Sequence, residues 1–317
     1  MRFTVDQWDP SYGTSVEPDA GEDHVQVDAD AELPAPDWQP LQPAPSPPGP
    51  LLFVDGVRRV DARLWIGGGD AGAHSGVCAS WAAGVVHCVP GEAAVVEGIE
   101  VGRSVAAALP VAEIEPILLP GGLGVYEPVQ ATAPTPEALW LAVQNEMGRC
   151  ERRLAERAGA TGGGGGALVV VDGPLRGRDH LPGQVGMVKT HHVDYLTDRP
   201  ARVLHTLRTG QRTPVFAIAG AFERWSWYVG LDAGGTGVPM AGVVRCEVGG
   251  RSRLADAIAV ADRVTAELPR YASEAHKDHR APQNLYPIAG LERLLRHRLG
   301  DSRLLYRGLR QAAMRSA

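Results

Sequence analysis

Two short apolar segments of this 317-residue chain each end in Asp-Gly, and they constrain its fold more than any other feature. The first is Leu51–Gly56 (LLFVDG), and the second, more than a hundred residues later, is Ala167–Gly173 (ALVVVDG). Short β-branched runs bounded by glycine or proline are typical of buried strands. We therefore expect Asp55 and Asp172 at the ends of two strands, where a sheet meets solvent. The alternative for either motif alone is that Asp-Gly merely begins a turn.

Two such strands side by side would bring both carboxylates within reach of one cation. Carboxylate oxygens are preferred ligands of Mg²⁺ and Mn²⁺. Paired carboxylates that hold these ions commonly serve in phosphodiester hydrolysis. The pair Asp55 and Asp172 therefore predicts a divalent-metal site.

The composition limits the class of protein. With 44% hydrophobic residues, the chain can form one large domain or two small ones. It has no apolar stretch long enough to span a bilayer and no signal-peptide pattern at its start, so we expect a cytoplasmic protein without membrane contact. The four cysteines are widely spaced and lack zinc-ligand spacing, which favours free buried thiols.

The first fifty residues differ from the rest. They are acidic and then rich in proline, ending in the segment PAPSPPGP. Such a segment buries too little apolar surface to offset its ordering entropy. We expect residues 1–50 to form a mostly disordered acidic and proline-rich arm, and residues 51–317 to form the folded domain.

The remaining pattern mixes strands with helices. Besides the two Asp-Gly strands, alternation predicts strands at 60–66, 81–89, 214–219, 224–231 and 242–248. A turn at Gly56–Arg59 would join the strand of the first Asp-Gly motif to the strand at 60–66. Apolar residues at helical spacing predict helices at 134–158, 254–268 and 287–299, the first capped by Thr135. This order favours an α/β fold with a mixed sheet flanked by helices, compatible with a ribonuclease-H-like fold.

The order of these motifs resembles the NurA family of DNA repair nucleases. The matching segments are Phe53–Gly56 (FVDG), an acid-containing helix ahead of Val170–Leu175 (VVDGPL), and Gly186–Lys189 (GMVK). The resemblance extends thinly over residues 51–300. It implies a ribonuclease-H-like homodimer that uses Mn²⁺ or Mg²⁺ to cut single-stranded DNA and to degrade DNA 5′ to 3′. It also implies a partner, a hexameric HerA-type ATPase and translocase, in DNA-end resection and repair.

Carried over to this chain, the resemblance implies three metal ligands. Asp55 and Asp172 match the two strand ligands, and the third should be a glutamate on the helix before the second strand. Glu151 is our choice, with Glu146 as the alternative. The two lie five residues apart and point in different directions, so they are not equivalent. For each glutamate alone, a solvated carboxylate on a helix face is the competing interpretation.

Lys189 and His191 complete the predicted catalytic set. Lys189 is one of two lysines in the chain, and its charge would contact the scissile phosphate. An ordinary surface lysine at a strand end is the alternative. His191 would carry protons or contact phosphate. The adjacent His192 would point the other way along a strand.

The C-terminal part departs from the family pattern. The family has an aromatic residue and a histidine there, and the usual histidine after a Pro-Leu turn is missing. Asp278, His279 and Asn284 are candidates to complete the site. This departure leaves a second hypothesis, a catalytically weak or inactive NurA-like adaptor of a DNA-processing complex. A phosphatase or other small-substrate hydrolase is a third. Beyond these candidates, the last stretch of chain is a basic amphipathic segment with seven arginines from Arg293 onward.

Overall fold

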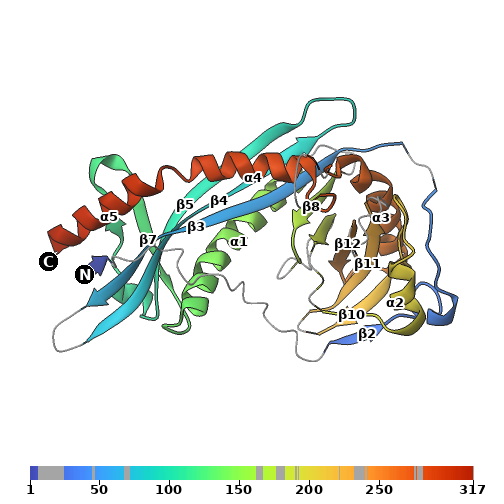
Figure 1. Cartoon of the computed structure of the whole chain (residues 1–317), viewed down its shortest axis with the longest axis horizontal. Coiled ribbons are helices and arrows are strands. Elements are labelled where there is room, and N and C mark those ends of the chain that lie inside the picture. The colour runs from blue at the N-terminus through green and yellow to red at the C-terminus, as the bar shows by residue number, and fades with distance from the viewer. Residues whose placement is uncertain are drawn as a thin grey trace.

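The structure is a computed structural model with a mixed α/β fold (Figure 1). It describes residues 1–5, 25–44, 47–67, 72–161, 167–175, 183–189, 191, 193–220, 222–231, 240, 242–274, 276 and 281–316. None of the helices in these ranges has the length and apolar character needed to cross a membrane. All four cysteines are free and buried, as predicted.

One large sheet runs the length of the described structure. Its strands are β1 (Phe3–Val5), β2 (Gln26–Asp28), β3 (Leu51–Gly67), β4 (Ala73–Cys88), β5 (Val95–Ala107), β6 (Ile117–Leu118), β7 (Val125–Gln130), β8 (Leu168–Asp172), β9 (Gln184–Val188), β10 (Phe216–Ala219), β11 (Arg224–Gly230) and β12 (Val243–Gly249). The order across the sheet is β2-β10-β11-β12-β9-β8-β3-β4-β5-β7-β6, and β1 pairs with β3. The α-helices are α1 (Pro136–Thr161), α2 (Asp198–Leu204), α3 (Leu254–Glu267), α4 (Tyr286–Arg298) and α5 (Ser302–Ser316).

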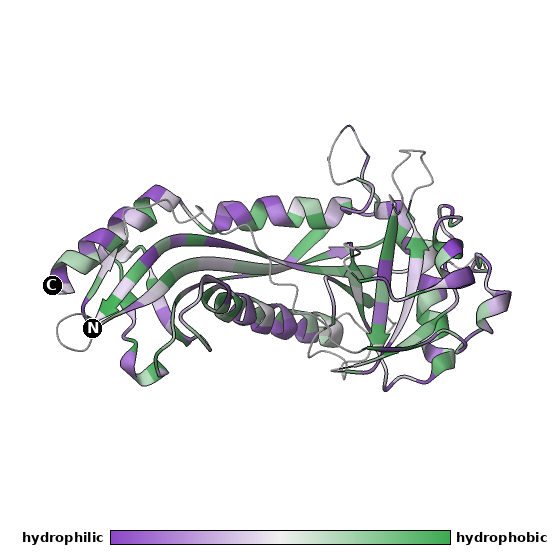
Figure 2. Ribbon diagram, turned by 60° about the horizontal axis from the view of Figure 1, so that its bottom comes forward, coloured by the Kyte–Doolittle hydropathy of each residue, from purple (hydrophilic) through white to green (hydrophobic). Residues whose placement is uncertain are grey.

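Helices cover both faces of the long strands, with α1 on one face and α4 on the other (Figures 1 and 2). The alternation of β3 explains this arrangement. Leu52 and Val54 pack in the cluster that includes α1, whereas Leu51, Phe53 and Val57 pack in the cluster that includes α4. A strand buried on both faces is apolar at successive positions, as the start of β3 is.

β3 meets β8 only over its first few residues. The two strands run parallel, in a register that pairs Leu51 with Leu168 and Val54 with Val171. β8 then ends at Asp172, while β3 continues to Gly67 beside β4. The sheet therefore opens along one side of β3 just beyond the shared segment.

The predicted turn at Gly56–Arg59 is wrong, because β3 is one unbroken strand of 17 residues. Asp55 consequently lies inside β3 and not at its end. β4 pairs along the whole of β3 and places Asp55 opposite Gly84, so the backbone bonds that a turn would interrupt are made. The glycine of this Asp-Gly pair instead allows α1 to pack closely against β3.

The predicted disorder of the N-terminal arm is wrong for residues 25–44. β2 pairs with β10, and Trp38 is fully buried, with its indole N–H 2.9 Å from the Ala29 carbonyl oxygen. Glu32 accepts two hydrogen bonds from the buried guanidinium of Arg212, at 2.8 and 2.9 Å. A few specific contacts fix this stretch despite its polar composition. The earlier part of the arm after β1 lies outside the described residues.

The predicted helices are confirmed within a few residues of their ends. Thr135 caps α1, since its Oγ1 accepts a hydrogen bond from the Ala138 amide at 3.3 Å. The C-terminal segment, however, is interrupted. Gly300 has a φ of +83°, which glycine adopts without strain, and it ends α4 before α5 begins.

Candidate metal centre

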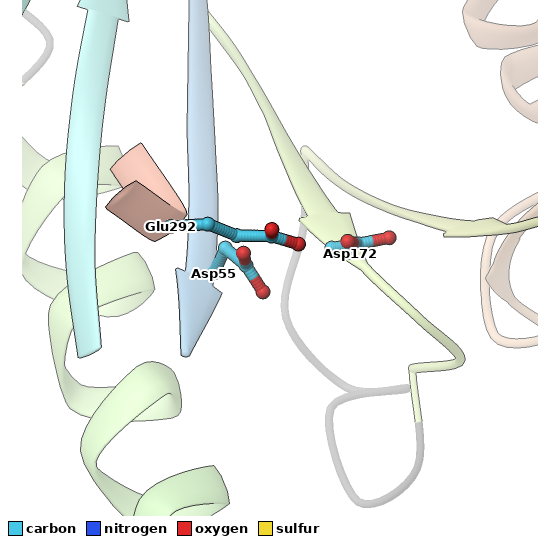
Figure 3. A group of neighbouring side chains, drawn as sticks. All are labelled: Asp55, Asp172 and Glu292. Atoms are coloured by element: carbon cyan, nitrogen blue, oxygen red, sulfur yellow. The ribbon is translucent and has the colours of Figure 1, made fainter. Parts of the chain in front are cut away.

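Three carboxylates from distant parts of the chain meet where the sheet opens. Asp55, Asp172 and Glu292 each offer an oxygen, and these oxygens all lie within 4.8 Å of one another (Figure 3). They come from β3, from the end of β8 and from α4. Among the described residues, this is the one group of three or more potential ligands with such spacing.

The strand register brings the two aspartates together. Val54 pairs with Val171, so Asp55 and Asp172 occupy the next position along each strand. Neighbouring strands lie about 4.8 Å apart, which sets the separation of their side chains. Gly173 follows with a φ of +104°, and this left-handed conformation turns the chain away from β3 directly after the aspartate.

Glu292 reaches the centre because α4 packs on β3. Ile288, Leu291 and Leu295 of α4 are buried in the same cluster as Phe53. Glu292 lies one turn after Ile288, at the margin of that buried face. Figure 3 shows its side chain extending from α4 toward the two aspartates.

Asp55 is the most confined of the three carboxylates, with 7% of its surface exposed. Burial is the main cause that raises its pKa well above the ordinary value, and the charges of Asp172 and Glu151 add to the effect. Its Oδ1 accepts a hydrogen bond from the Gly56 amide at 2.8 Å. Its Oδ2 is buried without a hydrogen-bond partner in the described part of the chain. A bound cation would stabilise such an oxygen.

Lys189 lies beside the aspartates, just after β9. Its Nζ is 2.6 Å from Oδ2 of Asp172 and 3.0 Å from Oδ1 of Asn284. Asn284 is fully buried, so it holds the ammonium group from the protein interior. Of the three C-terminal candidates, Asn284 therefore reaches the centre through Lys189. Asp278 and His279 lie outside the described residues.

Glu151 lies close to Asp55 but outside the group of three. It extends from α1, and a Cβ atom at Gly56 would collide with its Oε1. The glycine of the first Asp-Gly motif thus leaves room for a buried glutamate. The role of Glu151 as third ligand stays a prediction. Glu146, the alternative, forms an ion pair with Arg149 along the helix.

The structure does not bring His191 into the carboxylate group. Its Nε2 donates a hydrogen bond to the Val243 carbonyl oxygen at 2.9 Å, and its ring lies 5.8 Å from that of Tyr228. These contacts fix the imidazole against β11 and β12. Its predicted catalytic role is untested. His192 lies outside the described residues.

Sequence reasoning missed two residues, Glu292 and Glu247. Glu247 on β12 is fully buried and accepts hydrogen bonds from the Leu175 amide at 2.7 Å and from Arg245 at 2.6 Å. It anchors the segment that follows Asp172. For Glu292, the available signal was a carboxylate at the edge of an apolar helical stripe. For Glu247, it was an opposite-charge pair with Arg245, two residues apart within a strand that is otherwise apolar.

Comparisons with known proteins agree with this architecture at the level of fold. The fold is similar to that of the NurA nuclease from Sulfolobus solfataricus. The match covers 84% of this chain and 86% of that one, with a TM-score of 0.50 and 11% sequence identity. No protein-family model matches the sequence, and no curated protein matches it either. At this identity the similarity shows a shared fold, so the chemistry must be argued from the residues of this chain.

Proposed function

We propose that this protein is a divalent-metal-dependent nuclease that hydrolyses phosphodiester bonds in DNA. The observation that carries the proposal is the meeting of the Asp55, Asp172 and Glu292 carboxylates, in which the buried Oδ2 of Asp55 has no hydrogen-bond partner among the described residues. The fold shared with a NurA nuclease supports it. The ribonuclease-H-like character of the core is part of the same proposal.

The ligand set suits a hard cation. Asp55, Asp172 and Glu292 supply carboxylate oxygens alone, and the group contains no cysteine or histidine. Such oxygen ligands favour Mg²⁺ or Mn²⁺ over zinc. When bound, the cation would lower the pKa of an attacking water and offset charge on the phosphate.

The surrounding residues would position the substrate. Lys189 is held by Asp172 and Asn284, and its ammonium charge would attract a non-bridging phosphate oxygen. Glu151 stays a candidate ligand because its charge acts on Asp55. His191 would contact phosphate or carry protons if the substrate extends toward β12.

We further propose the cellular role that the resemblance implies. The protein would act as a homodimer, as a 5′–3′ exonuclease and single-strand endonuclease in DNA-end resection and repair. A HerA-like hexameric ATPase would supply the movement along DNA, since the chain has no G-x-x-x-x-G-K-[ST] motif of its own.

A cleavage assay tests the activity. End-labelled single- and double-stranded DNA would be incubated with Mn²⁺ and wild type, Asp55→Asn, Asp172→Asn or Glu292→Gln. We expect each substitution to reduce cleavage at least about 100-fold, by analogy with the loss seen when metal-supporting residues are removed. Asp256→Asn is the control, because Asp256 is an exposed partner of Arg253 and should leave cleavage unchanged.

Two outcomes would contradict the proposal. Absence of cleavage by folded, Mn²⁺-loaded wild type, even with a cognate translocase, would favour the adaptor hypothesis. Hydrolysis of a small phosphate ester without cleavage of DNA would favour a phosphatase.

A further inference from the structure

A row of exposed arginines follows the last two helices. We call it the basic ridge, and it consists of Arg293, Arg296, Arg298, Arg303, Arg307 and Arg310. Asp301 is the single acidic residue among positions 293–316. Its Oδ1 accepts hydrogen bonds from the backbone amides of Arg303 and Leu304 at 2.8 and 2.9 Å, so it caps α5. The ridge is therefore strongly positive in a chain whose net charge is −6.

Helical geometry directs the α5 arginines away from the protein core. Arg303, Arg307 and Arg310 follow the spacing i, i+4, i+7, which places them on one side of the helix. Leu305 and Leu309 on the other side are buried in the cluster that includes β3 and β5. The arginines thus form the solvent-facing side of a helix whose apolar side is already packed.

The ridge begins at the carboxylate centre. α4 places Glu292 in that centre and carries Arg293 and Arg296, both exposed, directly after it. α5 continues along the same side of the sheet to the C-terminus (Figure 1). Between the helices, Arg59 of β3 is ion-paired with Asp61 and donates a hydrogen bond to the Gly300 carbonyl oxygen at 2.9 Å, which ties the junction of α4 and α5 to the sheet. At about 1.5 Å per residue, the two helices together extend over roughly 40 Å.

We propose that the basic ridge binds the sugar-phosphate backbone of a DNA strand and guides it to the carboxylate centre. This inference rests on the proposed nuclease function and adds the path of its substrate. Guanidinium groups donate paired hydrogen bonds to phosphate oxygens, and rows of them follow a nucleic-acid backbone without reading its sequence.

An anionic membrane fits the ridge less well. A helix that lies on a membrane inserts a free apolar face among the lipids. The apolar face of α5 is occupied, since Leu305, Leu309, Ala312 and Ala313 are buried within the protein. Leu304 and Met314 are exposed on α5 but do not form a continuous apolar face, so the available surface carries mainly charge, which suits a polyanion in water.

DNA binding without cleavage tests the ridge. Fluorescence anisotropy of a labelled oligothymidylate would be measured in EDTA over a range of salt concentrations. The test variant combines Arg303→Gln, Arg307→Gln and Arg310→Gln. The matched control combines Arg202→Gln, Arg208→Gln and Arg251→Gln, three exposed arginines on or near α2 and between β12 and α3. Circular dichroism would verify that both variants fold.

We expect the ridge variant to bind DNA at least about tenfold more weakly than wild type. The negative slope of log K against log salt concentration should become shallower by about 2. Each lost phosphate contact removes about 0.7 from the magnitude of a single-strand slope. The control should keep both values.

The outcomes separate this inference from the nuclease proposal, because EDTA excludes metal-dependent cleavage. Equal slopes for the ridge and control variants would contradict DNA binding by the ridge, even if wild type cuts DNA. Absence of DNA binding by wild type would contradict it too. If the ridge variant binds DNA more weakly but wild type fails the cleavage assay, DNA binding by the ridge is supported and the nuclease proposal is rejected. Ridge-dependent binding to phosphatidylserine vesicles without DNA binding would assign this surface to a membrane.

Discussion

At the scale of single residues, the ionised Asp55 carboxylate destabilises the folded, metal-free protein. Its carboxylate is buried near other carboxylates, and Lys189 offsets this repulsion only in part. Removing an ion from water is unfavourable unless partners compensate. The residue is therefore stabilised by protonation or by a bound cation, and the two alternatives predict different responses to pH and to metal.

We predict that Asp55→Asn stabilises the metal-free protein near neutral pH. The raised pKa means that folded Asp55 keeps its proton to higher pH than the unfolded chain, whose carboxyl ionises near 3.8. Stability then falls as pH rises from about 4 through the folded pKa, because the folded state binds more protons. The variant should lose this part of the pH slope and have a higher Tm than wild type at pH 7, because its amide does not ionise.

Calorimetry in EDTA across a pH series would measure the change. A variant with an unaltered slope would show that Asp55 is not the group that titrates. Mn²⁺ should raise the Tm of wild type and leave that of Asp55→Asn nearly unchanged.

Gly56 illustrates how a single missing side chain shapes the centre. A Cβ atom there would collide with Oε1 of Glu151 and lie 2.9 Å from Cγ of Met147. We predict that Gly56→Ala lowers stability by about 1–3 kcal/mol through overpacking and displaces Glu151. Gly148→Ala is the control, because Gly148 lies on α1, the helix that carries Met147 and Glu151, and a Cβ there meets no atom within 4 Å. Alanine should be neutral or stabilising at that helical position. Similar Tm values for both variants would contradict this prediction.

At the scale of elements, the three predicted helices match α1, α3 and α4, and the strands predicted at 214–219, 224–231 and 242–248 match β10, β11 and β12, but the partners of these elements were not predictable. Apolar spacing predicted α4, yet it gave no indication that α4 packs on β3 and carries Glu292 to Asp55. Periodicity reports which face of a helix is buried and not what buries it. The same limit explains the false turn at Gly56–Arg59, since glycine marks turns and close approaches alike. Lys189 was predicted from its motif, whereas its support by Asn284 depends on long-range packing.

The segment from β2 to Trp38 shows a second limit. Its polar composition predicted disorder, but Glu32 binds Arg212, which is only 3% exposed and also contacts Asp262 at 2.6 Å. A small number of buried polar contacts can fix a segment that composition alone would leave free.

We predict that Glu32→Ala destabilises the protein by about 3–5 kcal/mol, because it leaves a buried guanidinium poorly compensated. It also removes the acceptor of the Val215 amide, 2.6 Å away. Loss of hydrogen-exchange protection should be strongest in residues 25–44 and around Val215. Asp37→Ala is the control, since Asp37 is an exposed acid of the same segment. Equal protection in the two variants would show that the Glu32 contact does not hold the segment.

At the scale of the whole molecule, β3 connects the functional parts. It supplies Asp55 to the carboxylate centre, faces Glu151 through Gly56, and contacts the α4–α5 junction through Arg59. The centre forms where the short parallel pair of β3 and β8 ends and the long antiparallel pair of β3 and β4 continues. Two aspartates a hundred residues apart could be matched by motif, but this junction arises only from the folded topology.

Calorimetric titration of the metal-free protein with Mn²⁺ tests the carboxylate centre most directly, because it requires no substrate or partner. Wild type, Asp55→Asn, Asp172→Asn and Glu292→Gln would be compared, with Glu146→Gln as a control that keeps all three carboxylates. We predict saturable Mn²⁺ binding by wild type and by the control, and affinity at least about tenfold weaker in each of the other variants. Absence of binding by wild type, or equal affinity in all variants, would contradict a metal site at Asp55, Asp172 and Glu292.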